Sequence, residues 1–162
     1  MSFDLSVNNL HTESIGTSYY LIGLINRFNN SFQAAADSIF PELSWKQIFF
    51  MNCVALFKDA PTIKDMADLL GCSHQNAKQI LSKLERQGFA ESYQDPVDKR
   101  KQRIMLTEKA KEFRRQYDQP SEQAMQSIFG NISEEELLTT ISVFTRLNKN
   151  VDQLKGDAFH EF

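Results

Sequence analysis

The stretch that decides the fold runs from Thr62 to Thr107 and reads TIKDMADLLGCSHQNAKQILSKLERQGFAESYQDPVDKRKQRIMLT. Its first part predicts two short helices joined by a tight turn at Gly71, because glycine readily ends a helix in a left-handed conformation. Its last part predicts a β-hairpin with four cations, Lys99, Arg100, Lys101 and Arg103. A short helix beside a cationic hairpin is the outline of a winged helix-turn-helix, so DNA binding is the leading hypothesis.

Local signals place the elements of this stretch. Thr62 with Asp65 has the spacing of a helix N-cap, and the helix that it opens is expected to end near Leu70. Ser73 caps the next helix, which Gly88 is expected to end. Strand-like segments follow at 89–93 and 103–106, and the residues between them are typical of a turn.

Longer helices are predicted on both sides of this stretch. Apolar residues recur at helical spacing from Thr12 to Phe40, and Ser44 with Gln47 opens a second helix that runs to about Phe57. After Thr107 a basic helix is expected to reach about Tyr117, where Pro120 forces a kink or a break. Ser133 with Glu136 then opens a last helix that ends at about Leu154.

The fold class that follows is mainly α with a small β-hairpin wing. A winged helix-turn-helix module at 43–107 is flanked by N- and C-terminal dimerisation helices at 12–42 and 108–155. These outer helices carry more apolar surface than a short chain easily buries, which favours a homodimer. The alternative is that they pack on the module in a monomer.

Bulk properties exclude several classes of protein. The chain has 162 residues, 41% of them hydrophobic, and no apolar run approaches the roughly 20 residues that cross a bilayer. The N-terminus lacks the pattern of a secretory signal, and two cysteines make no disulfide framework, so we expect a cytoplasmic protein. No phosphate-binding glycine loop, nucleophile elbow or metal-ligand spacing is present, so we expect neither an enzyme nor a cofactor or metal.

The net charge of −3 hides an uneven distribution. Residues 99–115 hold eight Lys and Arg against two acids, whereas residues 116–162 hold three against eight. An acidic body with one basic face binds a polyanion at that face and repels it elsewhere. The hairpin and the start of the following helix are therefore the expected cationic face.

The helix from Ser73 to Gln87 is the candidate recognition helix. Ala77, Ile80, Leu81 and Leu84 form its predicted inward face. Gln75, Asn76 and Gln79 are the candidates for reading bases, because Asn and Gln make bidentate hydrogen bonds to adenine in the major groove. The full set of predicted DNA-binding residues is Ser73, His74, Gln75, Asn76, Lys78, Gln79, Lys83, Lys99, Arg100 and Lys101. The alternative is an ordinary solvated helix face.

The hairpin strengthens the DNA hypothesis. Arg100 is the best candidate for a groove contact, because a guanidinium fits the negative potential of a narrow minor groove. Asp98 can pair with Arg100 or a neighbouring cation and so fix the shape of the hairpin. The alternative is a solubilising edge, where Lys guards against aggregation.

The chain resembles the multiple antibiotic resistance regulator (MarR) family of winged-helix transcription factors. The resemblance covers roughly residues 43–110 and rests on Leu43-Ser44-x-x-Gln47, the helix from Thr62 to Leu70, Leu84-Glu85-Arg86-Gln87-Gly88-Phe89, Asp98-x-Arg100 and Leu106-Thr107-x-Lys109. It implies a homodimer on a pseudo-palindromic double-stranded DNA operator, often a repressor released by a small molecule or by oxidation. Ala110, Asn76 and Gln79 depart from residues common in the family, which puts the operator sequence in doubt but not the fold.

The resemblance also implies an effector site. Tyr19, Trp45 and Phe49 are candidates for binding a small aromatic effector, together with Tyr20, Phe50 and Phe57. Aromatics at helical spacing also form ordinary cores, and that alternative stays open. Cys72 precedes a helix N-terminus, where a thiol can become reactive, or it is a small buried residue. A winged helix that binds a protein partner without DNA is the alternative function.

Overall fold

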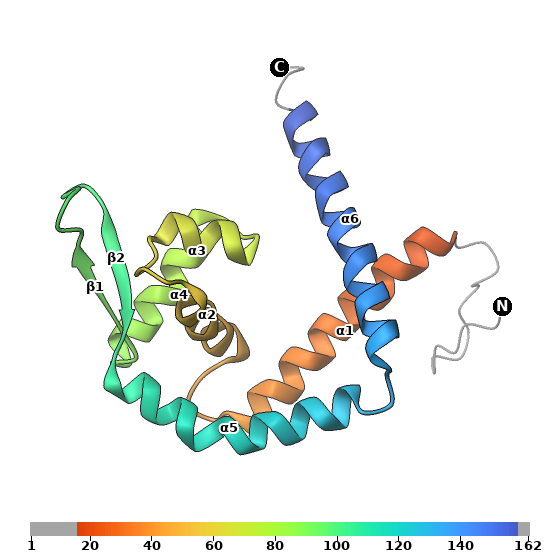
Figure 1. Ribbon diagram of the computed structural model, residues 1–162, viewed down its shortest axis with the longest axis horizontal. Helices are drawn as coiled ribbons and strands as arrows, with labels where there is room; N and C mark the ends of the chain where they lie inside the picture. The colour runs from red at the N-terminus through yellow and green to blue at the C-terminus, as the bar shows by residue number, and fades with distance from the viewer. Residues whose placement is uncertain (1–15, 159–162) are drawn as a thin grey trace. The chain divides into compact units, whose positions relative to one another are not determined.

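The computed structural model describes residues 16–158, which form six helices and one two-stranded hairpin (Figure 1). The elements in chain order are α1 (Thr17–Ile39), α2 (Trp45–Leu56), α3 (Ile63–Leu70), α4 (His74–Arg86), β1 (Ala90–Gln94), β2 (Gln102–Leu106), α5 (Glu108–Phe129) and α6 (Glu134–Ala158). The predicted fold class is confirmed. None of the helices in the described part of the chain is long and apolar enough to cross a membrane.

The chain divides into two compact units, one that ends at Arg115 and one that begins at Gln116. The first unit holds α1 to β2 and the first two turns of α5. The second holds the rest of α5 together with α6. The predicted winged module at 43–107 lies within the first unit, and the start of α5 packs on it through Ala110 and Phe113, which are both buried.

The core of the first unit gathers apolar side chains from every one of its elements. The largest fully buried side chains are Phe50, Met51, Met66, Leu84, Phe89, Ile104 and Pro61. Phe113 of α5 joins them, with its ring centroid 5.5 Å from that of Phe89 and 6.2 Å from that of Phe40. This aromatic cluster ties the end of α1 and the start of α5 to the end of α4.

The predicted helix caps are present. The Ser44 N–H donates to Gln47 Oε1 at 3.1 Å, and the Thr62 N–H donates to Asp65 Oδ2 at 2.8 Å. Gly71 ends α3 with φ at 61°, the left-handed conformation that glycine adopts without strain. These caps satisfy N–H groups that a helix terminus leaves without a partner, and they set where α2 and α3 begin.

The hairpin pairs β1 with β2 in antiparallel register, with Ser92 opposite Ile104. The loop before α3 adds a third, very short segment, because Thr62 forms an isolated bridge with Arg103 and Ile104 N donates to Pro61 O at 2.9 Å. The base of the hairpin is therefore joined to the beginning of α3 as well as to α4.

Two boundaries differ from the sequence-based expectation. The predicted break at Pro120 is wrong, because α5 runs without interruption from Glu108 to Phe129 with the proline inside it. A proline removes only its own N–H and displaces the carbonyl of residue i−4, here Gln116, so a long helix can continue through it. The last helix extends to Ala158, beyond the predicted end. Residues 12–15 of the predicted first helix lie outside the described residues.

Candidate nucleic-acid interface

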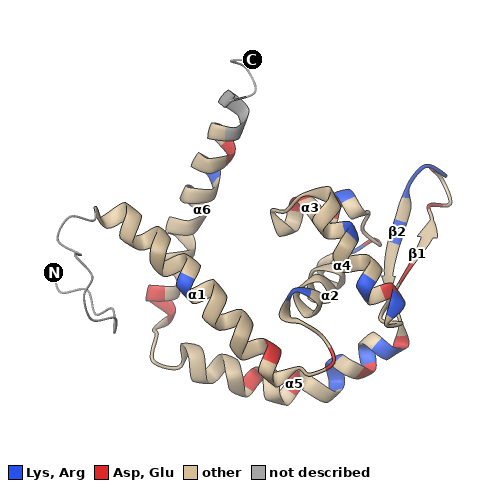
Figure 2. Ribbon diagram, turned by 180° about the vertical axis from the view of Figure 1, so that it is seen from behind, with Lys and Arg blue, Asp and Glu red and all other residues tan. Residues whose placement is uncertain are grey.

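The candidate recognition helix α4 separates its buried and exposed faces as the sequence predicts. Ala77, Leu81 and Leu84 are buried and Ile80 is partly buried. Ser73 caps the helix by accepting the Asn76 N–H at 3.2 Å. The predicted contact residues at its start and along its outer face are all exposed, namely Ser73, His74, Gln75, Asn76, Lys78, Gln79 and Lys83. Figure 2 shows the cations of α3, α4 and the hairpin on these elements.

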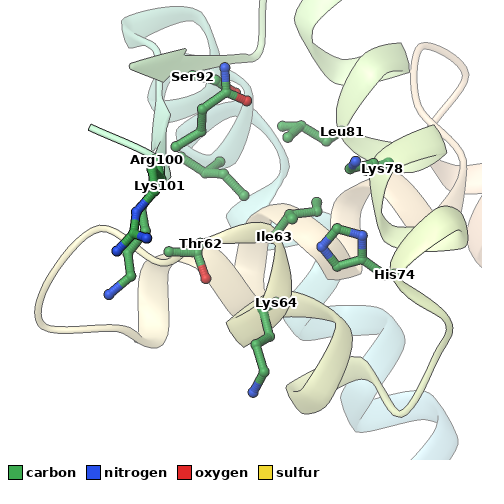
Figure 3. Close-up of a pocket in the computed structure, with 11 residues that line it drawn as sticks. Thr62, Ile63, Lys64, His74, Lys78, Leu81, Ser92, Arg100 and Lys101 are labelled. Atoms are coloured by element: carbon green, nitrogen blue, oxygen red, sulfur yellow. The ribbon is translucent and has the colours of Figure 1, made fainter. Parts of the chain in front are cut away.

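A groove of about 410 Å³ lies between α4, the start of α3 and the hairpin (Figure 3). Its cations come from three elements, with Lys64 on α3, Lys78 on α4, and Arg100 and Lys101 on the hairpin. His74 also lines it. Apolar side chains (Ile63, Leu81 and Ile104), two hydroxyls (Thr62 and Ser92) and the amide of Gln102 complete the lining. No aspartate or glutamate is among the described residues that line this groove, so its potential favours an anion.

The tip of the hairpin is organised around Asp98. Its Oδ1 accepts from both the backbone N–H and the Nε of Arg100, each at 3.2 Å, and its Oδ2 lies 3.7 Å from Lys101 Nζ. The predicted pairing of Asp98 with Arg100 is therefore confirmed. The Arg100 side chain remains 92% exposed, so the pairing orients the guanidinium without covering it. Lys99 is exposed, and no ion pair within the described residues involves it.

Arg103 behaves differently from the other cations of the hairpin. Its Nε donates to Asp95 Oδ2 at 2.6 Å and its Nη1 donates to Ala60 O at 2.8 Å, which turns the guanidinium toward the protein. Asp95 is buried, and its Oδ1 accepts the N–H groups of Val97 at 2.8 Å and Asp98 at 2.9 Å. The Asp98 N–H first, then Arg103, then the Val97 N–H lower the pKa of Asp95 to about 2. Arg103 is thus a structural cation and not part of the exposed positive surface.

The cations at the start of α5 are mostly engaged. Lys111 Nζ lies 3.0 Å from Glu108 Oε2, and Arg115 pairs with both Glu108 and Glu112. Lys109 Nζ donates to Gln87 O at 2.9 Å and lies 4.3 Å from the centroid of the Phe89 ring. The eight cations of residues 99–115 therefore overstate the positive surface there, because acids or carbonyls of the same unit hold several of them.

The aromatic residues predicted to bind an effector lie in different places, some in a crevice, one on the surface and one in the core. Trp45 and Phe49 line a crevice of about 310 Å³ together with Asn29, Gln33, Lys46, Leu70, Cys72, Asn76 and Ile80. The Trp45 ring meets Phe32 edge-on at 4.7 Å and stacks on Phe49 at 5.7 Å. Tyr19 does not line the crevice and is 80% exposed on α1, while Phe50 is fully buried. Burial also raises the pKa of the Cys53 thiol, which lies in the core of the first unit.

Sequence reasoning missed Lys46 as a cation for this crevice. It follows Trp45 at the start of α2, and only the packing of α1 against α2 brings it beside Gln33 and Asn29. Lone lysines are common on helix surfaces, so its position in the sequence carries no signal. The crevice offers a cation beside two aromatic rings, which is the complement of an aromatic acid.

The helix-turn-helix formed by α3 and α4, with the hairpin beside it, defines a winged helix-turn-helix protein. Residues 43–101, from just before α2 to the tip of the hairpin, match the model of the MarR family. Members of this family regulate transcription and are not enzymes. The match covers the candidate recognition helix and the groove lining except Gln102 and Ile104, but not the outer helices.

Individual known proteins are also similar to the chain. The chain is 28% identical over 93 residues to the transcriptional repressor MprA of Escherichia coli K12, an alignment that covers 57% of this chain and 53% of that protein. The chain thus matches about half the length of this curated relative. A MarR/EmrR family regulator from Acinetobacter sp. ADP1 shares the fold with a TM-score of 0.75, 18% identity, and coverage of 86% of this chain and 99% of that one. MepR of S. aureus, solved with DNA, has a TM-score of 0.72 at 21% identity, covering 85% and 99%.

Proposed function

We propose that the protein is a homodimeric, sequence-specific double-stranded DNA-binding regulator that represses transcription and is released by a small ligand or by oxidation. The observation that carries the proposal is the groove between α4 and the hairpin, where cations from three elements meet and none of the described lining residues is an acid. Asp68 and Asp98 pair with Lys64, Arg100 and Lys101 from outside the lining. The relationship to a transcriptional repressor and to a regulator solved with DNA supports the same function.

In this proposal α4 enters the major groove with its N-terminal end leading. Gln75, Asn76 and Gln79 then face base edges, where an amide side chain recognises adenine through two hydrogen bonds. Ser73 and the free N–H groups at the start of α4 receive a phosphate. The next sugar-phosphate strand lies in the cationic groove, where Lys64, Lys78 and Lys101 are within its reach. Arg100, oriented by Asp98 and otherwise exposed, enters the adjacent minor groove.

The proposed dimer rests on apolar side chains that each unit leaves exposed. On α1 these include Tyr19, Ile22 and Phe28, with 80%, 54% and 55% of their surface exposed. On α6 they include Leu138, Ile141, Val151 and Leu154. A large amount of exposed apolar surface on a helix marks an interface more often than a solvated surface. Two copies of α4 then read half-sites about 34–36 Å apart, one turn of the duplex.

The experiment that tests DNA binding is selection of genomic fragments with the full chain, followed by measurement of affinity for the selected duplex. We expect a two-fold symmetric site and a dimer in light scattering. Gln75→Ala is expected to cost about 1–3 kcal/mol at one base position in each half-site. Gln116→Ala removes an exposed glutamine on α5 and is expected to leave base preference unchanged. A dimer that binds no duplex at low salt would support a protein-binding winged helix instead.

A second part of the proposal is that the crevice of Trp45 and Phe49 binds the effector. The specific observation is Lys46 beside two aromatic rings, which suits a small aromatic acid. Trp45 is the only tryptophan of the chain, so its fluorescence reports on the crevice directly. We expect substituted benzoates to quench it saturably and to weaken DNA binding. Lys46→Gln should weaken that response, while Tyr19→Phe, outside the crevice, should not.

Oxidation is the other proposed route of release, and Cys72 is the residue that tests it. Cys72 is partly exposed, lines the same crevice and precedes the cap of α4. Peroxide treatment of the wild type is expected to weaken DNA binding. Cys72→Ser should abolish that loss, and a loss that persists in Cys72→Ser would remove this residue from the proposal.

A further inference from the structure

The hairpin contains an ion pair between Asp95 and Arg103 that is neither part of the strand pairing nor part of the exposed cationic surface. Asp95 is only 6% exposed although it lies in a hairpin of polar residues, and its partner Arg103 keeps 28% of its side chain exposed. A buried carboxylate is costly unless it is paired and hydrogen-bonded. Both carboxylate oxygens of Asp95 accept hydrogen bonds, so its burial is compensated. The role of the pair then depends on which parts of the chain it connects.

A continuous series of hydrogen bonds runs from the loop before α3 to Arg100. Ala60 O accepts from Arg103 Nη1, and Arg103 Nε donates to Asp95 Oδ2. Asp95 Oδ1 then accepts the N–H of Asp98, whose own carboxylate accepts the Nε of Arg100. Each bond is 3.2 Å or shorter. These hydrogen bonds thus connect the Arg100 side chain to the loop before α3 and so restrain its direction relative to the rest of the module.

The series begins at a part of the chain that is itself fixed. The loop before α3 is bonded to β2 by Ile104 N and Pro61 O, at 2.9 Å. Immediately after it, Thr62 and Asp65 form the cap of α3, and this cap lowers the pKa of Asp65. A rigid start matters, because an arginine fork that holds two acceptors transmits position only if both acceptors are anchored.

We propose that Asp95 and Arg103 are positioning residues that set the direction in which Arg100 enters the DNA minor groove. The inference rests on the proposed DNA-binding function. In it Arg103, although a cation in a cationic hairpin, contributes to affinity through Asp95 and not by neutralising a phosphate. Asp95, an acid close to a polyanion, strengthens DNA binding for the same reason.

Charge alone predicts a different result, which makes the proposal testable. Asp95→Asn raises the net charge of the protein by one and Arg103→Gln lowers it by one. If these residues act only through the electrostatic field, the first substitution tightens DNA binding and the second weakens it. If they position Arg100, both weaken binding, because each one breaks the same series of hydrogen bonds.

The experiment measures affinity of the full chain for the duplex that wild-type protein selects. We expect Asp95→Asn and Arg103→Gln each to lose about tenfold in affinity or more, the range of a well-placed groove contact. Asp68→Asn is the matched control, since it removes an exposed acid of the same module that bonds only Lys64. It should bind as tightly as wild type or more tightly. Tighter binding by Asp95→Asn would overturn the proposal.

Two further readouts separate positioning from general loss of structure. Arg103→Lys keeps the charge but cannot reach both Asp95 and Ala60, so it should also lose affinity. Wild type should prefer A/T-rich flanks, where the minor groove is narrow, over G/C-rich flanks. Arg100→Ala should lose that preference. We expect Asp95→Asn and Arg103→Lys to lose this flank preference too. When either is combined with Arg100→Ala, the fold loss in affinity of the double variant should be smaller than the product of the two single losses. Retained flank preference, or effects that multiply, would contradict the proposal.

The first measurement distinguishes the two possible failures. If wild-type protein binds no duplex, the proposed function fails and these variants have nothing to report. If wild type binds a selected duplex while Asp95→Asn and Arg103→Lys bind it equally well with the same flank preference, the proposed function stands and the positioning role is wrong. Melting temperature and dimerisation of each variant confirm that folded protein is compared.

Discussion

Lys99 and Lys111 make a matched pair of substitutions that tests which cations contact DNA. Both are lysines within residues 99–115, and both are exposed. Lys99 lies at the hairpin tip without an ion pair in the described chain, whereas Lys111 Nζ is 3.0 Å from Glu108. The pKa of Glu108 is lowered, with Lys111 as the largest cause. Replacement by alanine therefore removes an available charge in one case and an engaged one in the other.

The magnitude follows from counterion release. Each neutralised phosphate contributes about −0.9 to the slope of log affinity against log salt on duplex DNA. A dimer presents Lys99 twice, so Lys99→Ala should make the slope shallower by about 1.8. Between 50 and 200 mM salt, wild type should accordingly lose roughly tenfold more affinity than the variant. Lys111→Ala should leave the slope within about 0.3 of wild type, because a lysine that is held by Glu108 neutralises no phosphate.

Fluorescence anisotropy with a labelled operator over this salt range measures both slopes. Affinity at a single salt concentration is a poorer measure, because a change in folding or in dimerisation also moves it. If Lys99→Ala keeps the wild-type slope, the hairpin tip does not contact a phosphate. If Lys111→Ala shifts the slope as much as Lys99→Ala, the division between engaged and available cations is wrong.

Three stability predictions follow from the first unit. Phe113→Ala should lower the free energy of unfolding by about 3–5 kcal/mol in a denaturant titration, because the ring is buried against Phe89. A loss below about 1 kcal/mol would mean that the start of α5 does not pack there. Gly71→Ala should cost about 1 kcal/mol, from backbone strain at φ 61° and not from a clash, since no atom lies within 4 Å of the added Cβ. The pKa values of Asp95 and Asp65 are both lowered in the folded protein. The stability that these two carboxylates contribute is therefore complete above their ordinary pKa near 4 and is lost as the pH falls toward about 2. In that pH window the free energy of unfolding of Asp95→Asn should depend less on pH than that of wild type.

Much of the fold could be predicted because its signals are local. Ser44, Thr62, Ser73 and Ser133 each open a helix within a residue of the expected position, since a cap requires a particular side chain at a particular spacing. The inward face of α4 followed from periodicity alone. Pro120 was the exception, because the sequence shows the missing N–H but not whether the helix tolerates it.

The roles of individual charges could not be predicted, because they depend on partners distant in the sequence. Arg103 bonds Ala60, 43 residues earlier, and nothing in the hairpin sequence marks it off from Lys101. The same holds for Lys109, whose acceptor is the carbonyl of Gln87. A count of cations finds the basic region, but only the packing divides those that support the module from those that face outward.

The two ends of α4 are treated in opposite ways, and this asymmetry suits a helix that inserts into a groove. At its C-terminal end the carbonyls of Gln87 and Gly88 accept from Lys109 Nζ and Thr107 Oγ1, at 2.9 and 2.7 Å. The Gln87 side chain also bonds Gln47 of α2. At the N-terminal end the first N–H groups lack intrahelical acceptors, as in any helix, and Ser73 takes only that of Asn76. The C-terminal end of α4 is therefore held by hydrogen bonds to α2 and to the start of α5, while the N–H groups at its N-terminal end stay open for the phosphate contact that we propose.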